Sequence, residues 1–236
     1  MAPTTRTETV TAHDGGTFDA HVAVPSSGSG PGILLLQEIF GVNDYLRAVA
    51  DRLADLGYVS LAPDLFWRIE RNVDLPHDEG SMQKGFSLIQ QFDIDTGLRD
   101  CDAALTHLRG LPEVSGKVGV LGFCMGGRLA YHVAARSEPD AAVSYYGSGI
   151  ADFLDESEQI SCPIIFHFGS EDPFIPNEQV DRIADRLADR DNVELHIQQG
   201  AGHAFDNHLA PMFHNAEAAA AAWNLTTKFL DRELRG

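Results

Sequence analysis

The chain has 236 residues and a formal net charge of −18, from 17 basic and 35 acidic side chains. This length suits one hydrophobic core, so we expect a single domain over residues 1–236. A surface this acidic disfavours binding to nucleic acid and to anionic membranes.

The sequence carries no signal for export, membrane insertion or a disulfide framework. No apolar run approaches the roughly 18 residues that cross a bilayer, and the first ten residues lack the apolar core of a signal peptide. The three cysteines are an odd number at scattered positions, and no spacing of His, Cys and carboxylates is typical of a metal site. We therefore expect a cytoplasmic monomer without a metal or cofactor.

Short apolar runs alternate with amphipathic stretches along the whole chain. Strands are predicted at residues 18–24, 33–36, 58–62, 117–121, 141–145, 164–168 and 193–197. Helices are predicted at residues 43–56, 98–108, 127–136, 180–187 with a cap near Asn177, and 215–230. Residues 64–92 are predicted to be irregular, and such an excursion often covers an active site. The alternation predicts the α/β class, with a doubly wound, mostly parallel sheet flanked by helices.

The most informative segment is Gly122-Phe-Cys124-Met-Gly126, between a predicted strand and a predicted helix. This is the G-x-S-x-G nucleophile elbow of the α/β hydrolases with cysteine in the serine position. The turn is sharp, so side chains two residues to either side of the nucleophile would collide. The helix N-terminus favours a thiolate, and the Met125 amide can donate to an oxyanion. A buried structural cysteine is the alternative, but the flanking strand and helix favour the nucleophile.

A nucleophilic thiol needs a base, and the base needs an orienting carboxylate. In α/β hydrolases these groups follow in the order nucleophile, acid, histidine. Asp172 follows the strand that ends near residue 168, and His203 follows the next strand. Each has a plainer alternative, since Asp172 can open a turn before Pro173, Glu171 is a near competitor, and His203 can be a surface histidine. The ordered set favours a catalytic triad.

Nearly the whole chain resembles the dienelactone hydrolase family, the carboxymethylenebutenolidases. The QEIFG motif together with a cysteine nucleophile is particular to this family. The matching segments are Gln37-Glu-Ile-Phe-Gly41, Ala62-Pro-Asp-Leu65, Gly122-Phe-Cys-Met-Gly-Gly127, Tyr145-Tyr-Gly147, Glu171-Asp-Pro-Phe-Ile-Pro176 and Gly200-Ala-Gly-His-Ala-Phe205. The resemblance implies an α/β-hydrolase fold and hydrolysis of an ester or lactone.

Carried over residue by residue, the resemblance implies a role for each part of the site. Cys124 is the nucleophile, His203 the base and Asp172 its orienting acid. Glu38 helps to generate the thiolate, and the amides of Ile39 and Met125 form the oxyanion hole. The positions implied to contact substrate are Phe40, Met82, Phe86, Ile89, Tyr145, Ala204 and Asn207.

The chain departs from the family where the substrate carboxylate is bound. Two family arginines fall at Met82 and Asn207, and a tyrosine and a tryptophan fall at Phe86 and Ile89. A serine of the family falls at Ala204. Loss of a bidentate cationic clamp removes charge-assisted hydrogen bonds. We therefore expect a small-molecule ester or lactone that is less acidic than the dienelactone, more apolar or otherwise different.

Three alternatives stay open at this point. Another cation, such as Arg68, Arg71 or Lys84, can replace the clamp, which would make the chain a genuine carboxymethylenebutenolidase. A binding or sensor protein without catalysis can keep the same pocket, although an intact triad argues against it. A redox cysteine is the third, but no second cysteine lies within a few residues of Cys124.

Overall fold

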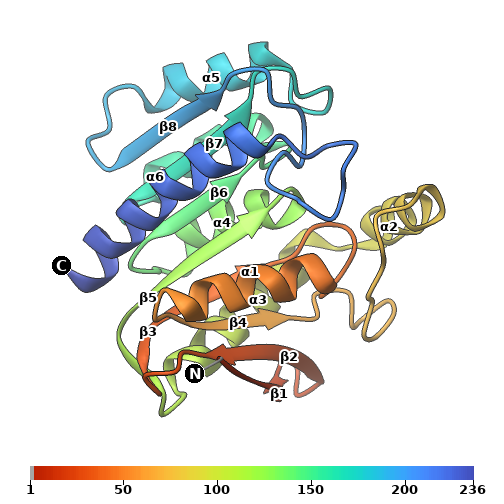
Figure 1. Ribbon diagram of the computed structural model, residues 1–236, viewed down its shortest axis with the longest axis vertical. Coiled ribbons are helices and arrows are strands. Elements are labelled where there is room, and N and C mark those ends of the chain that lie inside the picture. Colours follow the sequence, from red (N-terminus) through yellow and green to blue (C-terminus); the bar gives the residue numbers. More distant parts are fainter. Residues whose placement is uncertain (1–2) are drawn as a thin grey trace. The chain divides into compact units, whose positions relative to one another are not determined.

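The computed structural model describes residues 3–236, in which strands and helices alternate (Figure 1). Contacts between residues divide the chain into two compact units, Met1–Val118 and Gly119–Gly236. The expectation of a single domain stays a prediction. Within the described residues, no helix is both long and apolar enough to cross a membrane.

The first unit combines an antiparallel edge with a parallel pair. Strands β1, β2, β4 and β3 are neighbours in that order, with β1 and β2 antiparallel to their partners and β3 parallel to β4. The strands are β1 (Thr4–Thr11), β2 (Thr17–Val24), β3 (Gly30–Leu36) and β4 (Val59–Pro63). The helices are α1 (Asp44–Asp55), α2 (Glu79–Gln91) and α3 (Ile94–Arg109).

The second unit is a parallel sheet with helices on both faces. Strands β5, β6, β7 and β8 are neighbours in that order and all run parallel. In Figure 1, α6 crosses in front of these strands and α4 lies behind them. The strands are β5 (Val114–Phe123), which begins in the first unit, β6 (Ala142–Tyr145), β7 (Ile164–Gly169) and β8 (Val193–Gln198). The helices are α4 (Met125–Arg136), α5 (Asn177–Leu187), α6 (Ala216–Arg235) and the 3₁₀ segments η1 (Ile150–Asp152) and η2 (Leu154–Gln159).

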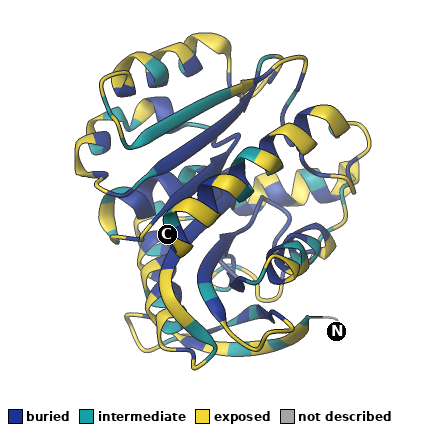
Figure 2. Ribbon diagram, turned by 60° about the vertical axis from the view of Figure 1, so that its left-hand side comes forward, coloured by how far each residue is buried: buried dark blue, intermediate teal, exposed yellow. Residues whose placement is uncertain are grey.

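Burial explains why the central strands are apolar without alternation. Every residue of β4, β6 and β7 is buried, as the dark blue strands of Figure 2 show. A strand covered on both faces has no solvent side, so its polar residues are few and are themselves buried, as Ser60, Ser144 and His167 are. The uniform apolar run at residues 33–36 and the mostly apolar run at 164–168 both lie in buried strands.

Three elements differ from the sequence prediction. Strand β1 was not predicted, because only Val10 of its residues is buried and the rest are polar. Helix α2 lies inside the segment predicted to be irregular, and it buries only three residues, Ser81, Gly85 and Leu88. Helix α5 begins at Asn177, and its cap position is Pro176, so the expected Asn177 cap is wrong.

The junction of β5 with α4 allows no side chain at Gly122. A β-carbon built there would lie 1.9 Å from the carbonyl oxygen of Gly126. That oxygen belongs to the first turn of α4, so the clash cannot be relieved by rotating a side chain. The close approach lets the strand turn directly into the helix.

We therefore expect Gly122→Ala to lower the free energy of unfolding by at least about 2 kcal/mol, through overpacking against backbone. Urea denaturation measures this. Gly80→Ala is the matched control, because its nearest neighbour would be Asp78 Oδ1 at 3.6 Å and no strained φ is involved. Equal stability of the two variants would contradict the packing argument.

Candidate active site

Cys124 occupies a strained position between β5 and α4. Its φ of 54° and ψ of −115° lie outside the conformations that non-glycine residues normally adopt. The Cys124 N–H donates to the carbonyl oxygen of Tyr145 at 3.0 Å, and the Cys124 carbonyl accepts from Arg128 N at 3.1 Å. These bonds tie the turn to β6 on one side and to α4 on the other. Strain of this kind is typical of functional positions, and it leaves the Cys124 side chain partly exposed.

His203 and Asp172 form a buried hydrogen-bonded pair on the loops that follow β8 and β7. His203 Nδ1 lies 2.7 Å from Asp172 Oδ2. The other carboxylate oxygen, Oδ1, accepts from the backbone N–H groups of Phe174 at 2.8 Å and Ile175 at 3.2 Å. Glu171, the sequence competitor, is exposed. The structure therefore pairs His203 with Asp172, and the carboxylate is held by its own loop.

The protonated form of His203 is favoured by two neighbouring side chains. Burial by itself disfavours the imidazolium, but the Cys124 and Asp172 side chains outweigh burial and raise the pKa of His203 to about 10. Asp172 Oδ2 is within hydrogen-bonding distance of the imidazole, and the Cys124 side chain is near enough to favour its charged form. A cysteine, a histidine and a carboxylate thus lie together in the second unit.

Aromatic side chains surround the His203 imidazole. Tyr146 lies 5.2 Å away and Phe174 lies 5.1 Å away, measured between ring centroids. Phe174 is 49% exposed although its neighbours are buried, so it forms a rim beside the histidine. An apolar wall of this kind limits water around the imidazole.

Three residues implied to contact substrate lie in the same unit. Tyr145 is fully buried, with its hydroxyl 2.7 Å from Thr226 Oγ1. Asn207 is also fully buried, and its Oδ1 accepts from Leu209 N at 3.1 Å. Ala204 has a φ of 54° directly after His203. The structure thus places the tyrosine hydroxyl and the asparagine carbonyl in intramolecular hydrogen bonds, and their contact with substrate stays a prediction.

In the first unit, Glu38 lies just after β3 and is 4% exposed. Its Oε2 is 3.3 Å from His77 Nε2, and the His77 side chain is 5% exposed. The Phe40 ring contacts the His77 ring in a tilted arrangement, with 4.2 Å between the ring centroids. The sequence analysis missed His77, because it lies in a segment without periodicity and its partner is 39 residues away. The catalytic role of Glu38 and the oxyanion role of Ile39 stay predictions.

Helix α2 brings together the three expected recognition positions of the first unit. Met82, Phe86 and Ile89 follow at helical spacing and share one face. Phe86 is 42% exposed. Gly85 lies beside this face and packs closely, since a β-carbon there would lie 2.8 Å from the Ile39 carbonyl oxygen. The helix therefore presents an apolar face where the family carries charged and aromatic groups.

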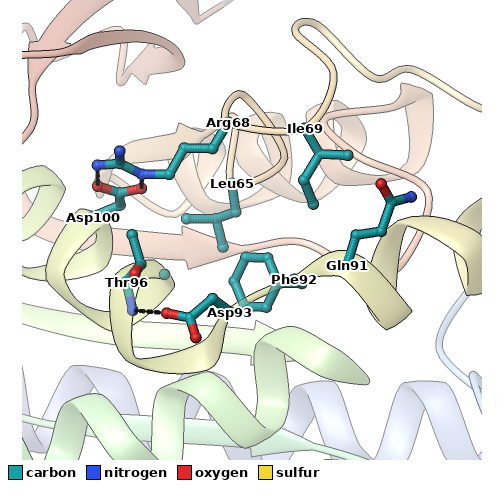
Figure 3. Close-up of a pocket in the computed structure, with 9 residues that line it drawn as sticks. Leu65, Arg68, Ile69, Gln91, Phe92, Asp93, Thr96 and Asp100 are labelled. Atoms are coloured by element: carbon teal, nitrogen blue, oxygen red, sulfur yellow. Dashed lines mark hydrogen bonds and ion pairs between the residues drawn. The ribbon is translucent and has the colours of Figure 1, made fainter.

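The three cations that could have replaced the family arginines are all paired. Figure 3 shows the Arg68 guanidinium turned onto Asp100 beside a pocket that Leu65 and Phe92 also line. Arg68 donates through Nε and Nη2 to the two Asp100 oxygens, both at 2.8 Å. Arg71 donates to the Thr17 carbonyl at 2.9 Å, and Lys84 is paired with Glu70. Arg68 is therefore held by a buried carboxylate, whereas Arg71 and Lys84 are each held by a single contact near the surface.

The other two cysteines are buried. Burial raises the pKa of Cys101, and it raises the pKa of Cys162 to about 11. Both are therefore thiols near neutral pH, unlike a reactive cysteine. Within residues 3–236, no group of three His, Cys, Asp or Glu side chains is placed to hold a metal ion.

Solved structures show the class of the fold. A dienelactone hydrolase-like promiscuous phosphotriesterase from metagenomic libraries matches with a TM-score of 0.84 and 27% identity, over 99% of this chain and 100% of that chain. A structure described as a putative dienelactone hydrolase from Klebsiella pneumoniae matches with a TM-score of 0.83 and 25% identity, over 97% and 98% of the two chains. The fold is that of the α/β hydrolases.

The family follows from the sequence comparisons. Residues 18–234 match the dienelactone hydrolase family. A carboxymethylenebutenolidase of Pseudomonas putida is 37% identical over 197 residues, which covers 83% of this chain and 84% of the relative. The chain therefore belongs to the dienelactone hydrolase family, and the resemblance stated from the motifs is confirmed.

The pairing of His203 with Asp172 predicts a pH dependence. The wild-type imidazolium should persist up to a pH of about 10, whereas Asp172→Asn should titrate at a clearly lower pH, because one of the two anions that favour the cation is gone. NMR titration of the His203 ring protons measures this. Glu171→Gln removes an exposed carboxylate from the same loop and should leave the titration unchanged. An unchanged titration in Asp172→Asn would contradict the assigned pairing.

Proposed function

We propose that the protein hydrolyses an ester or lactone bond of a small molecule, with Cys124 as nucleophile, His203 as acid and base, and Asp172 as the acid that orients it. The observation that carries this proposal is the 2.7 Å contact between His203 Nδ1 and Asp172 Oδ2 beside a cysteine on a strained elbow. Family membership supports hydrolysis as the reaction.

In the first step, the Cys124 thiolate attacks the carbonyl carbon and the carbonyl oxygen becomes an oxyanion. The Met125 amide belongs to the first turn of α4, where N–H groups have no intrahelical acceptor, so it can donate to this oxyanion. When the intermediate collapses, the C–O bond breaks and the departing alkoxide takes the proton from the His203 imidazolium. A thioester on Cys124 remains. When the substrate is a lactone, the alcohol formed by ring opening stays attached to the same acyl group.

In the second step, neutral His203 removes a proton from water, and the hydroxide attacks the thioester. Collapse of this intermediate expels the Cys124 thiolate and releases the carboxylic acid. His203 is then an imidazolium again, favoured by both neighbouring anions. By family resemblance, Glu38 takes part in generating the thiolate and the Ile39 amide completes the oxyanion hole.

The recognition positions favour a substrate other than the usual dienelactone carboxylate. Met82 and Asn207 replace two arginines, and the neighbouring cations Arg68, Arg71 and Lys84 already have partners. Because recognition groups rather than the fold set specificity, the same chemistry is expected on a different ester or lactone.

Replacing the nucleophile tests the reaction. We expect Cys124→Ala to reduce kcat/KM for p-nitrophenyl acetate at least about 100-fold, down to the uncatalysed background, because no thioester can form. Mass spectrometry of the wild type during turnover should find an acetyl group on Cys124. Cys162→Ala removes a buried thiol and should keep the activity. If Cys124→Ala hydrolyses the ester as fast as the wild type, the proposed nucleophile is wrong.

A genuine carboxymethylenebutenolidase is the second candidate, favoured by the relatives that carry this name. Comparison of kcat/KM for a dienelactone and for p-nitrophenyl acetate separates the two. We expect the uncharged ester to be the better substrate, because the arginine clamp is absent. Should the dienelactone be cleaved far faster, a cation elsewhere holds its carboxylate and the second candidate is correct.

A further inference from the structure

A row of polar side chains follows the nucleophile along one face of α4. Cys124, Arg128, His132 and Arg136 succeed one another at intervals of four residues. At a rise of about 1.5 Å per residue, each lies about 6 Å beyond the last on the same side of the helix. The segment η2 packs against this helix. The row thus runs from Cys124 past the buried His132 to the exposed Arg136.

The far end of this row is neutralised by Glu156 on η2. The Glu156 Oε1 accepts from Arg136 Nη2 at 2.6 Å, and Oε2 accepts from Arg136 Nε at 3.0 Å. Oε2 also lies 2.9 Å from His132 Nδ1. The Glu156 carboxylate therefore contacts both His132 and Arg136, and it binds the Arg136 guanidinium through both oxygens.

Arg128, one turn from the nucleophile, has no such partner. It is half-buried, and within residues 3–236 its Nε makes no hydrogen bond and no carboxylate forms an ion pair with its guanidinium. The side chain lies over Gly149, where a β-carbon would be 3.1 Å from Arg128 Nη1. Burial lowers the pKa of Arg128, while the negative charges of Cys124 and Asp152 favour its charged form.

A half-buried guanidinium without a hydrogen-bonded carboxylate is unusual, because its desolvation is not offset by a close ion pair. Its planar donors fit a carboxylate better than any other common group. The protein as a whole carries a charge of −18, which repels anions. An anionic ligand therefore needs a local cation, and Arg128 is placed for this beside Cys124.

We propose that Arg128 is a specificity-determining residue that binds a carboxylate on the acyl part of the substrate. The inference rests on the proposed role of Cys124 as nucleophile. Arg128 stands at neither of the positions, Met82 and Asn207, where the family carries its arginines. The site thus favours an ester or lactone whose negative charge lies on the α4 side of the reacting carbonyl, and not at the positions of Met82 and Asn207, where the family arginines hold the dienelactone carboxylate.

Two alkylating agents of nearly equal size test this charge preference without hydrolysis. Iodoacetate is an anion and iodoacetamide is neutral, and each forms a sulfur–carbon bond with Cys124 as iodide leaves. We expect the ratio of their rates, iodoacetate over iodoacetamide, to fall on the order of tenfold in Arg128→Gln. Arg128→Lys should retain part of the preference, and added salt should reduce the ratio in the wild type. Cys124→Ala identifies the alkylated site.

Arg136→Gln is the matched control, since it removes an arginine from the same helix face two turns away and should keep the wild-type ratio. An unchanged ratio in Arg128→Gln, or an equal fall of both rates, would overturn the proposal. If the variant does not fold, protection of wild-type Cys124 from iodoacetamide by propionate but not by propionamide supports it, and equal protection overturns it. A charge-dependent ratio in a protein that cleaves no ester would leave the anion site standing and reject only the proposed hydrolysis.

Discussion

The left-handed backbone at Cys124 is the constraint on which the second unit depends. It persists because the Cys124 N–H is bound to the Tyr145 carbonyl and because Gly122 lets β5 pass directly over the first turn of α4. Any side chain at Gly122 would force the strand and the helix apart. The turn sets the sulfur at a helix N-terminus and at the carboxyl end of a parallel strand. The loops after β7 and β8 end at the same edge, so Asp172 and His203 reach the site from neighbouring strands.

Electrostatics at this site run against the charge of the whole protein. The surface is strongly acidic, yet the second unit gathers an imidazolium favoured by two anions and a half-buried guanidinium one turn from the sulfur. Local cations of this kind count more than net charge, since a partly desolvated interaction at short range is screened less than one between distant surface charges. The proposed thiolate chemistry and the proposed anion binding both depend on the local positive potential of His203 and Arg128.

Recognition and chemistry are carried by different parts of the chain. The proposed triad residues lie on an elbow and two loops that follow strands, and they match the motifs of the family. The recognition positions lie on α2 and on the loop after His203, where apolar or internally bonded side chains replace the family's charged ones. Arg68 is poorly suited to replace a family arginine. Its guanidinium already binds the buried Asp100 carboxylate, and leaving that carboxylate unpaired would cost a large free energy.

The sequence by itself determined the α/β class, the elbow at Cys124 and the ordered acid and histidine, because these depend on local periodicity, on glycine sterics and on chain order. It did not predict β1, which buries only Val10, or α2, whose three buried residues include Ser81 and Gly85. It also left open whether Asp172 or Glu171 lies against His203. Only the tertiary structure decided that Asp172 makes this contact, that His77 lies against Glu38, and that Glu156 neutralises Arg136 but not Arg128. These contacts join residues 20 to 40 positions apart. Such partners are selected by the way loops pack in the folded chain, and the spacing of residues in the sequence does not reveal them.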